Sequence, residues 1–134
     1  MTTRPTKRSV RVAARVHEVL MEMLLRGEIR DRHAQGALIS RVEMSDDLRH
    51  TRVYLRLLDG NAPPRRRDAL VRAMNAAKGF VRRELGARLE LKYTPDLVFF
   101  WDEGVDRVLR VEQLLEEIRA DEKIPGPEGD GGAA

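Results

Sequence analysis

The sequence predicts a single α+β domain in which a three-stranded sheet packs against helices. Apolar residues recur at helical spacing near the N-terminus, after residue 68 and near the C-terminus. Between these segments they alternate with polar residues, which is typical of half-buried strands. The length of 134 residues fits one core. With 42% hydrophobic but only 4% aromatic residues, that core is expected to consist mainly of Leu, Val, Met and Ala.

Residues 8–25 are predicted to form an amphipathic helix. Its apolar stripe consists of Val12, Val16, Val19, Leu20, Met23 and Leu24. Arg8, Arg11 and Arg15 lie on the opposite stripe, close to the helix N-terminus. Positive charge there opposes the helix dipole, at a cost of about 0.3–1 kcal/mol per exposed charge. The placement therefore favours an external anion as partner, with simple solubility as the alternative.

Two strands with a short connection are predicted next. In residues 38–44 the positions Leu38, Ser40, Val42 and Met44 alternate with Ile39, Arg41 and Glu43. In residues 51–58 one face carries Val53, Leu55 and Leu57, and the other carries Arg52, Tyr54 and Arg56. The turn formers Ser45-Asp46-Asp47 between the two runs indicate an antiparallel hairpin.

A second helical segment is predicted over residues 68–85, after a proline-containing turn at 59–64. Gly79 interrupts it, where alanine would be better by roughly 1 kcal/mol. We expect a bend at this glycine. Four basic residues surround the bend on the side away from the core, namely Arg72, Lys78, Arg82 and Arg83.

The rest of the chain is predicted to contain a third strand and a last helix. The strand begins at 89–93, is interrupted at 94–96 and resumes at 97–101. The helix starts at 102–106 and ends near Asp121, with an apolar stripe expected in the core: Val108, Val111, Leu114, Leu115 and Ile118. The predicted organisation is a flexible N-terminus over 1–7, one domain over 8–121 and a disordered acidic tail over 122–134.

Charge is distributed unevenly along the chain. The net charge is only +3, but residues 61–92 carry nine Arg/Lys against three Asp/Glu, and residues 93–119 carry three against seven. A concentrated positive field provides most of the sequence-independent affinity for phosphate backbones. The basic segments therefore predict a polyanionic partner, whereas the C-terminal third does not.

Several classes of function are disfavoured. There are no cysteines, and His17, His33 and His50 lack metal-ligand spacing, so we expect neither a metal nor a cofactor. Asp46 and Asp47 are interpreted as residues that cap a turn, not as catalytic carboxylates. No apolar run is long enough to span a membrane and no signal peptide is evident, which favours a cytoplasmic protein.

The motifs, taken in order, resemble the ribosome-binding factor A family over about residues 8–119. The resemblance rests on the segment Val42-Glu43-Met44-Ser45-Asp46-Asp47-Leu48, on Ala77-Lys78-Gly79-Phe80-Val81-Arg82, and on residues 91–102. It implies a type II KH-like domain with a mixed sheet whose last strand runs parallel to the first. It also implies a helix-kink-helix at Ala77-Lys78-Gly79, with Gly79 as the kink residue, in place of the Gly-x-x-Gly loop of ordinary KH domains.

The implied function is late maturation of the small ribosomal subunit. The resemblance predicts binding to 16S rRNA in the immature 30S subunit, no catalysis, a monomeric state, and an assembly GTPase as a further candidate partner. The predicted RNA contacts are Arg8, Arg11, Arg15, Arg72, Lys78, Gly79, Arg82 and Arg83. The alternative is a general nucleic-acid-binding domain that is not dedicated to ribosomes, which composition alone would equally permit.

Two further features permit more than one interpretation. The aromatic run Phe99-Phe100-Trp101 could stack on bases, but its position at a strand end beside Leu97 favours the core, with Trp101 a minor candidate for stacking. The run Arg65-Arg66-Arg67 could reach phosphates or merely keep a proline-rich loop soluble, and the sequence leaves this open.

Overall fold

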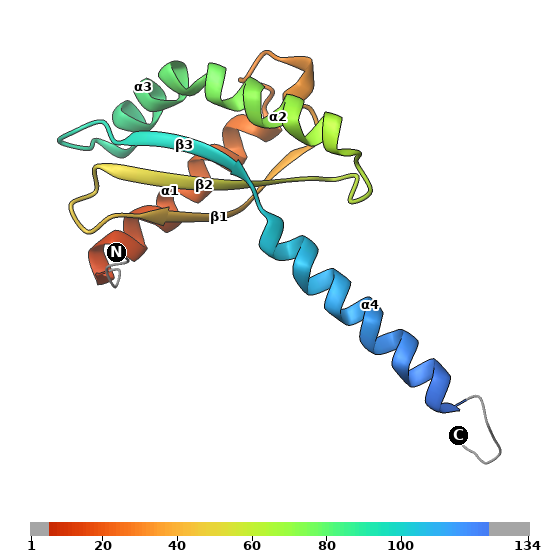
Figure 1. Ribbon diagram of the computed structural model, residues 1–134. Helices are drawn as coiled ribbons and strands as arrows, with labels where there is room; N and C mark the ends of the chain where they lie inside the picture. Colours follow the sequence, from red (N-terminus) through yellow and green to blue (C-terminus); the bar gives the residue numbers. More distant parts are fainter. Residues whose placement is uncertain (1–5, 124–134) are drawn as a thin grey trace. The chain divides into compact units, whose positions relative to one another are not determined.

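The computed structural model describes residues 6–123 and has the predicted α+β architecture (Figure 1). Its elements are α1 (Lys7–Leu25), η1 (Arg32–Ala34), β1 (Ala37–Met44), β2 (His50–Leu57), α2 (Pro64–Ala76), α3 (Lys78–Leu89), β3 (Asp96–Trp101) and α4 (Glu103–Lys123). The chain forms two compact units, one that ends at Trp101 and one that begins at Asp102. The first unit contains the whole sheet.

The sheet is mixed, with the strand order β1-β2-β3. β1 and β2 are antiparallel, as the hairpin prediction requires, and β3 runs parallel to β2. The expectation that the last strand runs parallel to the first is therefore wrong, since β3 is parallel to the second strand. The reason is the connection, because the α2–α3 segment carries the chain back so that it can enter β3 in the direction of β2.

The three helices of the first unit cover one face of the sheet. α1 packs on β1, whereas α2 and α3 pack on β3. Buried residues of all these elements form one cluster that includes Leu20, Val53, Leu70, Leu85 and Phe99. Figure 1 looks onto the other face, with the strands in front of α1. This second face lacks a layer of helices from the first unit.

The start of α1 shows why the helix begins where it does. Thr6 is extended, and its side-chain oxygen accepts a hydrogen bond from the backbone N–H of Ser9 at 3.0 Å. This is the capping role that a threonine fills well at a helix N-terminus. Val16, Leu20 and Met23 are fully buried, which confirms the predicted apolar stripe.

A bulge in β1 changes which residues face the core. The register with β2 shifts between Ile39 and Arg41, which places a bulge at Ser40. Ala37, Ile39 and Met44 are consequently buried, whereas the simple alternation grouped Leu38 with Met44. An inserted residue reverses the side-chain alternation beyond it, which is why period two fails here.

The third strand is shorter than the sequence predicts. Leu89 ends α3, and Glu90 follows in the left-handed conformation with φ 52° and ψ 44°. The chain therefore turns at the end of the helix and pairs with β2 only from Asp96 onward. Alternation over residues 89–93 indicated a strand, but the end of a helix followed by a loop gives the same local pattern.

Asn75 holds the outer edge of β3. Its side-chain oxygen accepts a hydrogen bond from the N–H of Phe99 at 3.0 Å, and its amide group donates to the carbonyl of Phe99 at 3.1 Å. The side chain thereby pairs with both backbone groups that an additional strand would pair with. This pairing joins α2 to the edge of the sheet and blocks the edge at that point.

The second unit consists of α4 as far as the structure describes it. The five residues expected in a core stripe are exposed, with fractions between 44% and 59%. That expectation is wrong, because helical periodicity identifies an apolar face but not whether another layer covers it. The flexible N-terminus and the acidic tail lie outside the described residues over 1–5 and 124–134, and the predicted domain limits at 8 and 121 stay predictions.

Candidate nucleic-acid interface

The break between α2 and α3 lies at Ala77. This residue has φ −88° and ψ 0°, and its N–H donates to the carbonyls of Ala73 and Met74. Gly79 is inside the first turn of α3, so the bend expected at the glycine falls two residues earlier. A Cβ atom added to Gly79 would meet only Nη1 of Arg83 at 3.7 Å. There is therefore room for a side chain at this position, and the fold does not require glycine there. The glycine leaves the backbone near the break exposed.

The N-terminus of α3 is open to solvent. Ala77 precedes it and offers no side-chain acceptor for the first amides of the helix. Such free N–H groups, together with the helix dipole, attract anions. We call the exposed residues around this point the junction surface, and it consists of Arg72, Lys78, Gly79 and Arg83.

The cations of the junction surface are not ion-paired with any other described part of the protein. Within residues 6–123 the structure shows no ion pair to Arg72, Lys78 or Arg83. The Arg83 guanidinium lies over the first turn of α3, close to Gly79. Positive charge at this end of a helix opposes the dipole. A bound anion would offset this unfavourable placement.

Arg82 differs from its neighbours, because it is part of the fold. Its Nε donates to the carbonyl of Pro95 at 2.9 Å, and Nη2 lies 3.4 Å from the carboxylate of Asp96. The side chain is 37% exposed. Arg82 therefore joins α3 to the start of β3, which the sequence did not indicate.

The three arginines of α1 are exposed, as predicted. Arg15 lies 3.5 Å from the carboxylate of Glu18, in a pair that is mostly solvated. The N-terminus of α1 lies beside the β1–β2 turn, since the N–H of Thr6 donates to Asp46 at 3.2 Å. The junction surface instead adjoins the middle of β3 through Asn75. The two predicted groups of contacts thus occupy different margins of the first unit.

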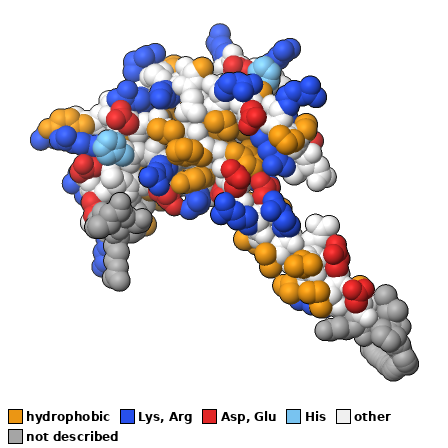
Figure 2. All heavy atoms as spheres, in the orientation of Figure 1, with side chains coloured by type: hydrophobic (Ala, Val, Ile, Leu, Met, Phe, Trp, Pro, Cys, Tyr) orange, Lys and Arg blue, Asp and Glu red, His pale blue; other side chains and the backbone are white. Residues whose placement is uncertain are grey.

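The distribution of charge over the visible face agrees with this division. Figure 2 shows Lys and Arg side chains along the margin formed by α2 and α3, and hydrophobic side chains gathered near the centre of the sheet. A nucleic acid could thus meet positive charge at the rim and apolar groups in the middle.

Two of the three arginines at 65–67 have structural roles. Arg66 donates to the carbonyls of His33 and Gln35 at 2.6 and 2.7 Å and so holds η1 against α2. Arg67 donates to the carbonyl of Ala62 at 2.9 Å. Arg65 is exposed. Of this run, Arg65 has the side chain most available to an external anion.

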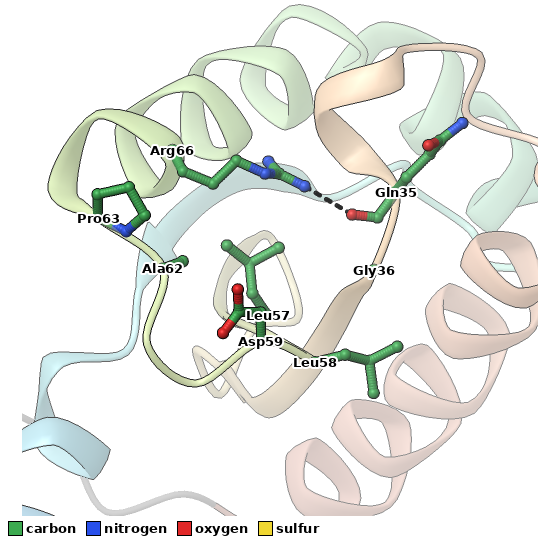
Figure 3. Close-up of a pocket in the computed structure, with 8 residues that line it drawn as sticks. All are labelled: Gln35, Gly36, Leu57, Leu58, Asp59, Ala62, Pro63 and Arg66. Carbon is green, nitrogen blue, oxygen red and sulfur yellow. Dashed lines mark hydrogen bonds between the residues drawn. The ribbon is translucent and has the colours of Figure 1, made fainter.

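The hollow beside Arg66 does not have the character of an active site. It measures about 450 Å³ and lies between the end of β2, the start of β1 and the start of α2 (Figure 3). Its acidic member, Asp59, accepts a hydrogen bond from the N–H of Asn61 at 3.0 Å, in a local turn. Its basic member, Arg66, is bound to backbone carbonyls, so both polar groups serve the loops around them.

The carboxylates at the β1–β2 turn likewise serve the backbone. Asp47 accepts hydrogen bonds from the hydroxyl of Ser45 at 2.7 Å and from the N–H of Arg49 at 3.0 Å. The hydrogen bond from Ser45 is the largest of the causes that lower the pKa of Asp47. The turn interpretation is thus confirmed for Asp47, whereas Asp46 accepts a hydrogen bond from the N–H of Thr6, outside the turn. Among residues 6–123 no group of His, Asp and Glu has a metal-binding arrangement.

Arg88 forms an ionic cluster with three glutamates. It is hydrogen-bonded to Glu28 and Glu84, and it lies 4.0 Å from Glu22. The hydrogen bond to Glu28 is the main cause that raises the pKa of Arg88. This cluster joins the end of α3 to the end of α1 and the loop that follows it. Arg88 therefore belongs to the scaffold and not to the interface.

The aromatic run of β3 is divided between the two faces of the sheet. Phe99 is 1% exposed, and Trp101 packs at the border of the core, with the guanidinium of Arg67 5.0 Å from its ring centroid. Phe100 points the other way and is 38% exposed. The core interpretation is confirmed for Phe99 and Trp101 and is wrong for Phe100.

Some important residues were missed, although the sequence carried signals for them. Asn75 is a weak helix former in the middle of a predicted helix, which often means that its side chain is bound elsewhere. The pairing of Tyr54 with Phe100 was hidden, because it depends on which strands are neighbours. Local periodicity contains no such information.

Comparison with known proteins gives one family. The family described as Ribosome-binding factor A matches residues 8–115. The chain is 41% identical over 113 residues to ribosome-binding factor A of Sorangium cellulosum, covering 84% of this chain and 90% of that protein. It is 36% identical over 117 residues to that of Geotalea uraniireducens, covering 87% and 93%.

Solved structures agree with this result. A solution structure of a Thermotoga maritima protein described as ribosome binding factor A is similar, with a TM-score of 0.62 and 30% identity over 77% of this chain and 94% of that one. The crystal structure of ribosome-binding factor A from Thermus thermophilus has a TM-score of 0.58, at 19% identity over 69% and 94% of the two chains, and supports the fold. Within residues 6–123, no helix combines the length and the apolar character that crossing a membrane requires.

Proposed function

The chain belongs to the ribosome-binding factor A family, and from this membership we propose that it binds the immature 30S ribosomal subunit through 16S rRNA. It takes part in late maturation of that subunit and leaves before translation begins. The protein does so in the cytoplasm as a monomer, without a cofactor and without catalysis. An assembly GTPase is a further candidate partner.

The observation that carries the proposal is the junction surface. Three exposed cations that form no ion pair within residues 6–123 surround an uncapped helix N-terminus, at a break that leaves the backbone accessible at Gly79. Free amides and cations together suit a phosphate, since both favour negative charge at the same point. The junction surface thus provides the main contact with the rRNA backbone.

The remaining predicted contacts have unequal roles. Arg8, Arg11 and Arg15 form a second basic group at the start of α1, so a long RNA would span both margins. Arg82 stays among the predicted contacts, but two of its nitrogens are already engaged with Pro95 and Asp96. It acts chiefly by fixing α3 in place. Contacts to phosphates fix position without reading sequence, so subunit shape decides where the protein binds.

The test is co-sedimentation with immature small subunits at increasing salt. The Lys78→Ala/Arg83→Ala double variant is expected to weaken binding and to reduce the dependence of log K on log salt by roughly 1–2 units, because each phosphate that is no longer neutralised lowers the slope by about one. Arg107→Ala/Arg110→Ala is the matched control, because it removes the same charge from the acidic C-terminal third. Equal effects of the two double variants would mean that net charge, not the junction surface, governs binding.

The alternative is a nucleic-acid-binding domain not dedicated to ribosomes. The same basic surface supports it, since phosphate contacts alone do not select a partner. Competition separates the two functions. Unlabelled immature 30S subunits should displace the protein from labelled RNA far better than random RNA of equal nucleotide concentration. Equal displacement would favour the general domain.

A further inference from the structure

The open face of the sheet has an unusual composition. We use this name for the face opposite α1, α2 and α3, and it consists of Arg41, Glu43, Arg52, Tyr54, Val98 and Phe100. A sheet face without a covering layer normally carries polar residues. Here β3 instead presents Val98 and Phe100, which are 40% and 38% exposed.

Three of these side chains form a continuous stack across the strands. The guanidinium carbon of Arg41 lies 3.9 Å from the ring centroid of Tyr54. The rings of Tyr54 and Phe100 lie 5.6 Å apart with an angle of 28° between their planes. The strand register places Arg41 on one flank of Tyr54 and Phe100 on the other. Both sides of the tyrosine ring are thus occupied within the protein.

Phe100 ends this stack and is 38% exposed. β3 is an edge strand, so no further strand continues the row beyond it. Among residues 6–123 Tyr54 is the one aromatic ring that stacks on Phe100, and no cation lies over the phenylalanine. Residues 6–123 therefore supply no further flat group to this row.

The stack is held in place before any ligand arrives. Glu43 accepts hydrogen bonds from Arg41 at 2.5 Å and from the hydroxyl of Tyr54 at 3.3 Å. Asn75 fixes the backbone of Phe99, next to Phe100. A ring that is already ordered loses little conformational entropy on binding, which favours affinity.

Charge on this face fits a nucleic acid. Arg52 is exposed and, within the described residues, forms no ion pair, and it lies across from Val98 in the register. The edge that carries Phe100 is also the edge to which α2 is bound, directly before the junction surface. An RNA strand that crosses this edge of the sheet would meet cations on one side and an aromatic ring on the other.

We propose that the open face binds single-stranded RNA, with an unpaired base stacked on Phe100 and the backbone phosphate near Arg52. The stack Arg41–Tyr54–Phe100 is then extended by one base. Every base has a π-face, so this contact selects unpaired over paired RNA and not one sequence over another. The proposal rests on the RNA binding proposed above and adds a second surface to it.

The test measures binding of the full-length protein to an oligoadenylate of about ten nucleotides and to a duplex of the same length. The probe carries a fluorescent adenine analogue whose emission falls when it stacks. Phe100→Leu should weaken binding of the single strand by about five- to 100-fold and abolish the quenching, and should leave duplex binding unchanged. Phe100→Tyr keeps an aromatic ring, so it should retain the quenching and the affinity for the single strand. Val111→Leu, at an exposed aliphatic residue of α4 that belongs to neither proposed surface, should change neither.

The outcomes distinguish this proposal from the one on which it rests. If Phe100→Leu leaves quenching and affinity intact while Lys78→Ala/Arg83→Ala weakens binding of both probes, the stacking platform is wrong and the junction surface stands. Weaker binding through Phe100→Leu alone would support the platform and count against the junction surface. If Phe100→Leu affects neither probe but reduces retention on small subunits, the face contacts a protein, which overturns the proposal.

Discussion

Phe99 and Phe100 are neighbours in the chain, yet they belong to opposite faces of the sheet. Phe99 lies beneath α2 and is 1% exposed, whereas Phe100 is 38% exposed on the face that α1, α2 and α3 leave uncovered. The covered face contains the aliphatic cluster that unites helices and strands. The open face contains a row of side chains that ends at the partly exposed ring of Phe100.

If the open face binds RNA as proposed, one strand serves both stability and binding. Successive side chains of a strand point to opposite faces, so each residue of β3 is assigned to one task by its position alone. The covered face must exclude water, and changes there should alter the free energy of unfolding. The open face is less constrained by packing, and changes there should alter binding with little effect on stability.

Substitution of the two phenylalanines tests this division with the largest expected effect. Phe99→Ala should lower the free energy of unfolding by about 3–5 kcal/mol, because it leaves a cavity in the core. Phe100→Ala should lower it by about 1 kcal/mol, chiefly because Tyr54 no longer has a ring to stack on. Urea denaturation followed by circular dichroism measures both. Equal decreases would mean that the open face is packed like a core.

Asn75 sharpens the comparison, since it fixes the strand that carries both rings. Asn75→Ala should destabilise the protein by about 1–3 kcal/mol, because the N–H and the carbonyl of Phe99 lose their partners. Asn75→Asp keeps an acceptor for the N–H and should recover part of the stability. Thermal unfolding of the parent chain and the two Asn75 variants ranks their stabilities. An alanine variant as stable as the parent chain would show that water replaces the side chain without cost.

Arg82 and Arg83 provide a smaller contrast at the border of the covered face. Arg82→Ala should cost about 1–2 kcal/mol of stability, because it removes the hydrogen bond to the carbonyl of Pro95. Arg83→Ala should leave stability within about 0.5 kcal/mol and weaken RNA binding. Denaturation and filter binding of both variants separate the two effects. If Arg83→Ala destabilises the protein as much as Arg82→Ala does, Arg83 has a structural role and does not belong to the junction surface.

The sequence predicted the helices and strands better than it predicted how they pair and pack. The α1 helix and the hairpin follow from local periodicity, and the alternating faces of β2 are those of the structure. The bulge at Ser40 was not predictable, because the residue types in β1 do not indicate where its register with β2 shifts. The exposed stripe of α4 shows the same limit at the level of packing.

The candidate site was predictable in part for the same reason. Charge along the chain indicated the basic residues, but not which of them have internal partners. Arg66, Arg82 and Arg88 are bound to carbonyls or carboxylates from segments distant in sequence. Lys78 and Arg83 have the same chemistry without such partners among residues 6–123. The difference depends on tertiary contacts, which a pattern of charges does not encode.

The hydroxyl of Tyr54 gives the smallest and most discriminating effect. Tyr54→Phe removes the hydrogen bond to Glu43, which is solvated and 3.3 Å long, so stability should change by less than about 0.5 kcal/mol. The ring remains against Phe100, so base quenching should persist. Tyr54→Thr removes the ring, keeps a residue that favours strands, and should reduce quenching because Phe100 loses its support. Equal quenching in both variants would show that Phe100 needs no stacked partner, and the row across the sheet would then be a feature of strand pairing alone.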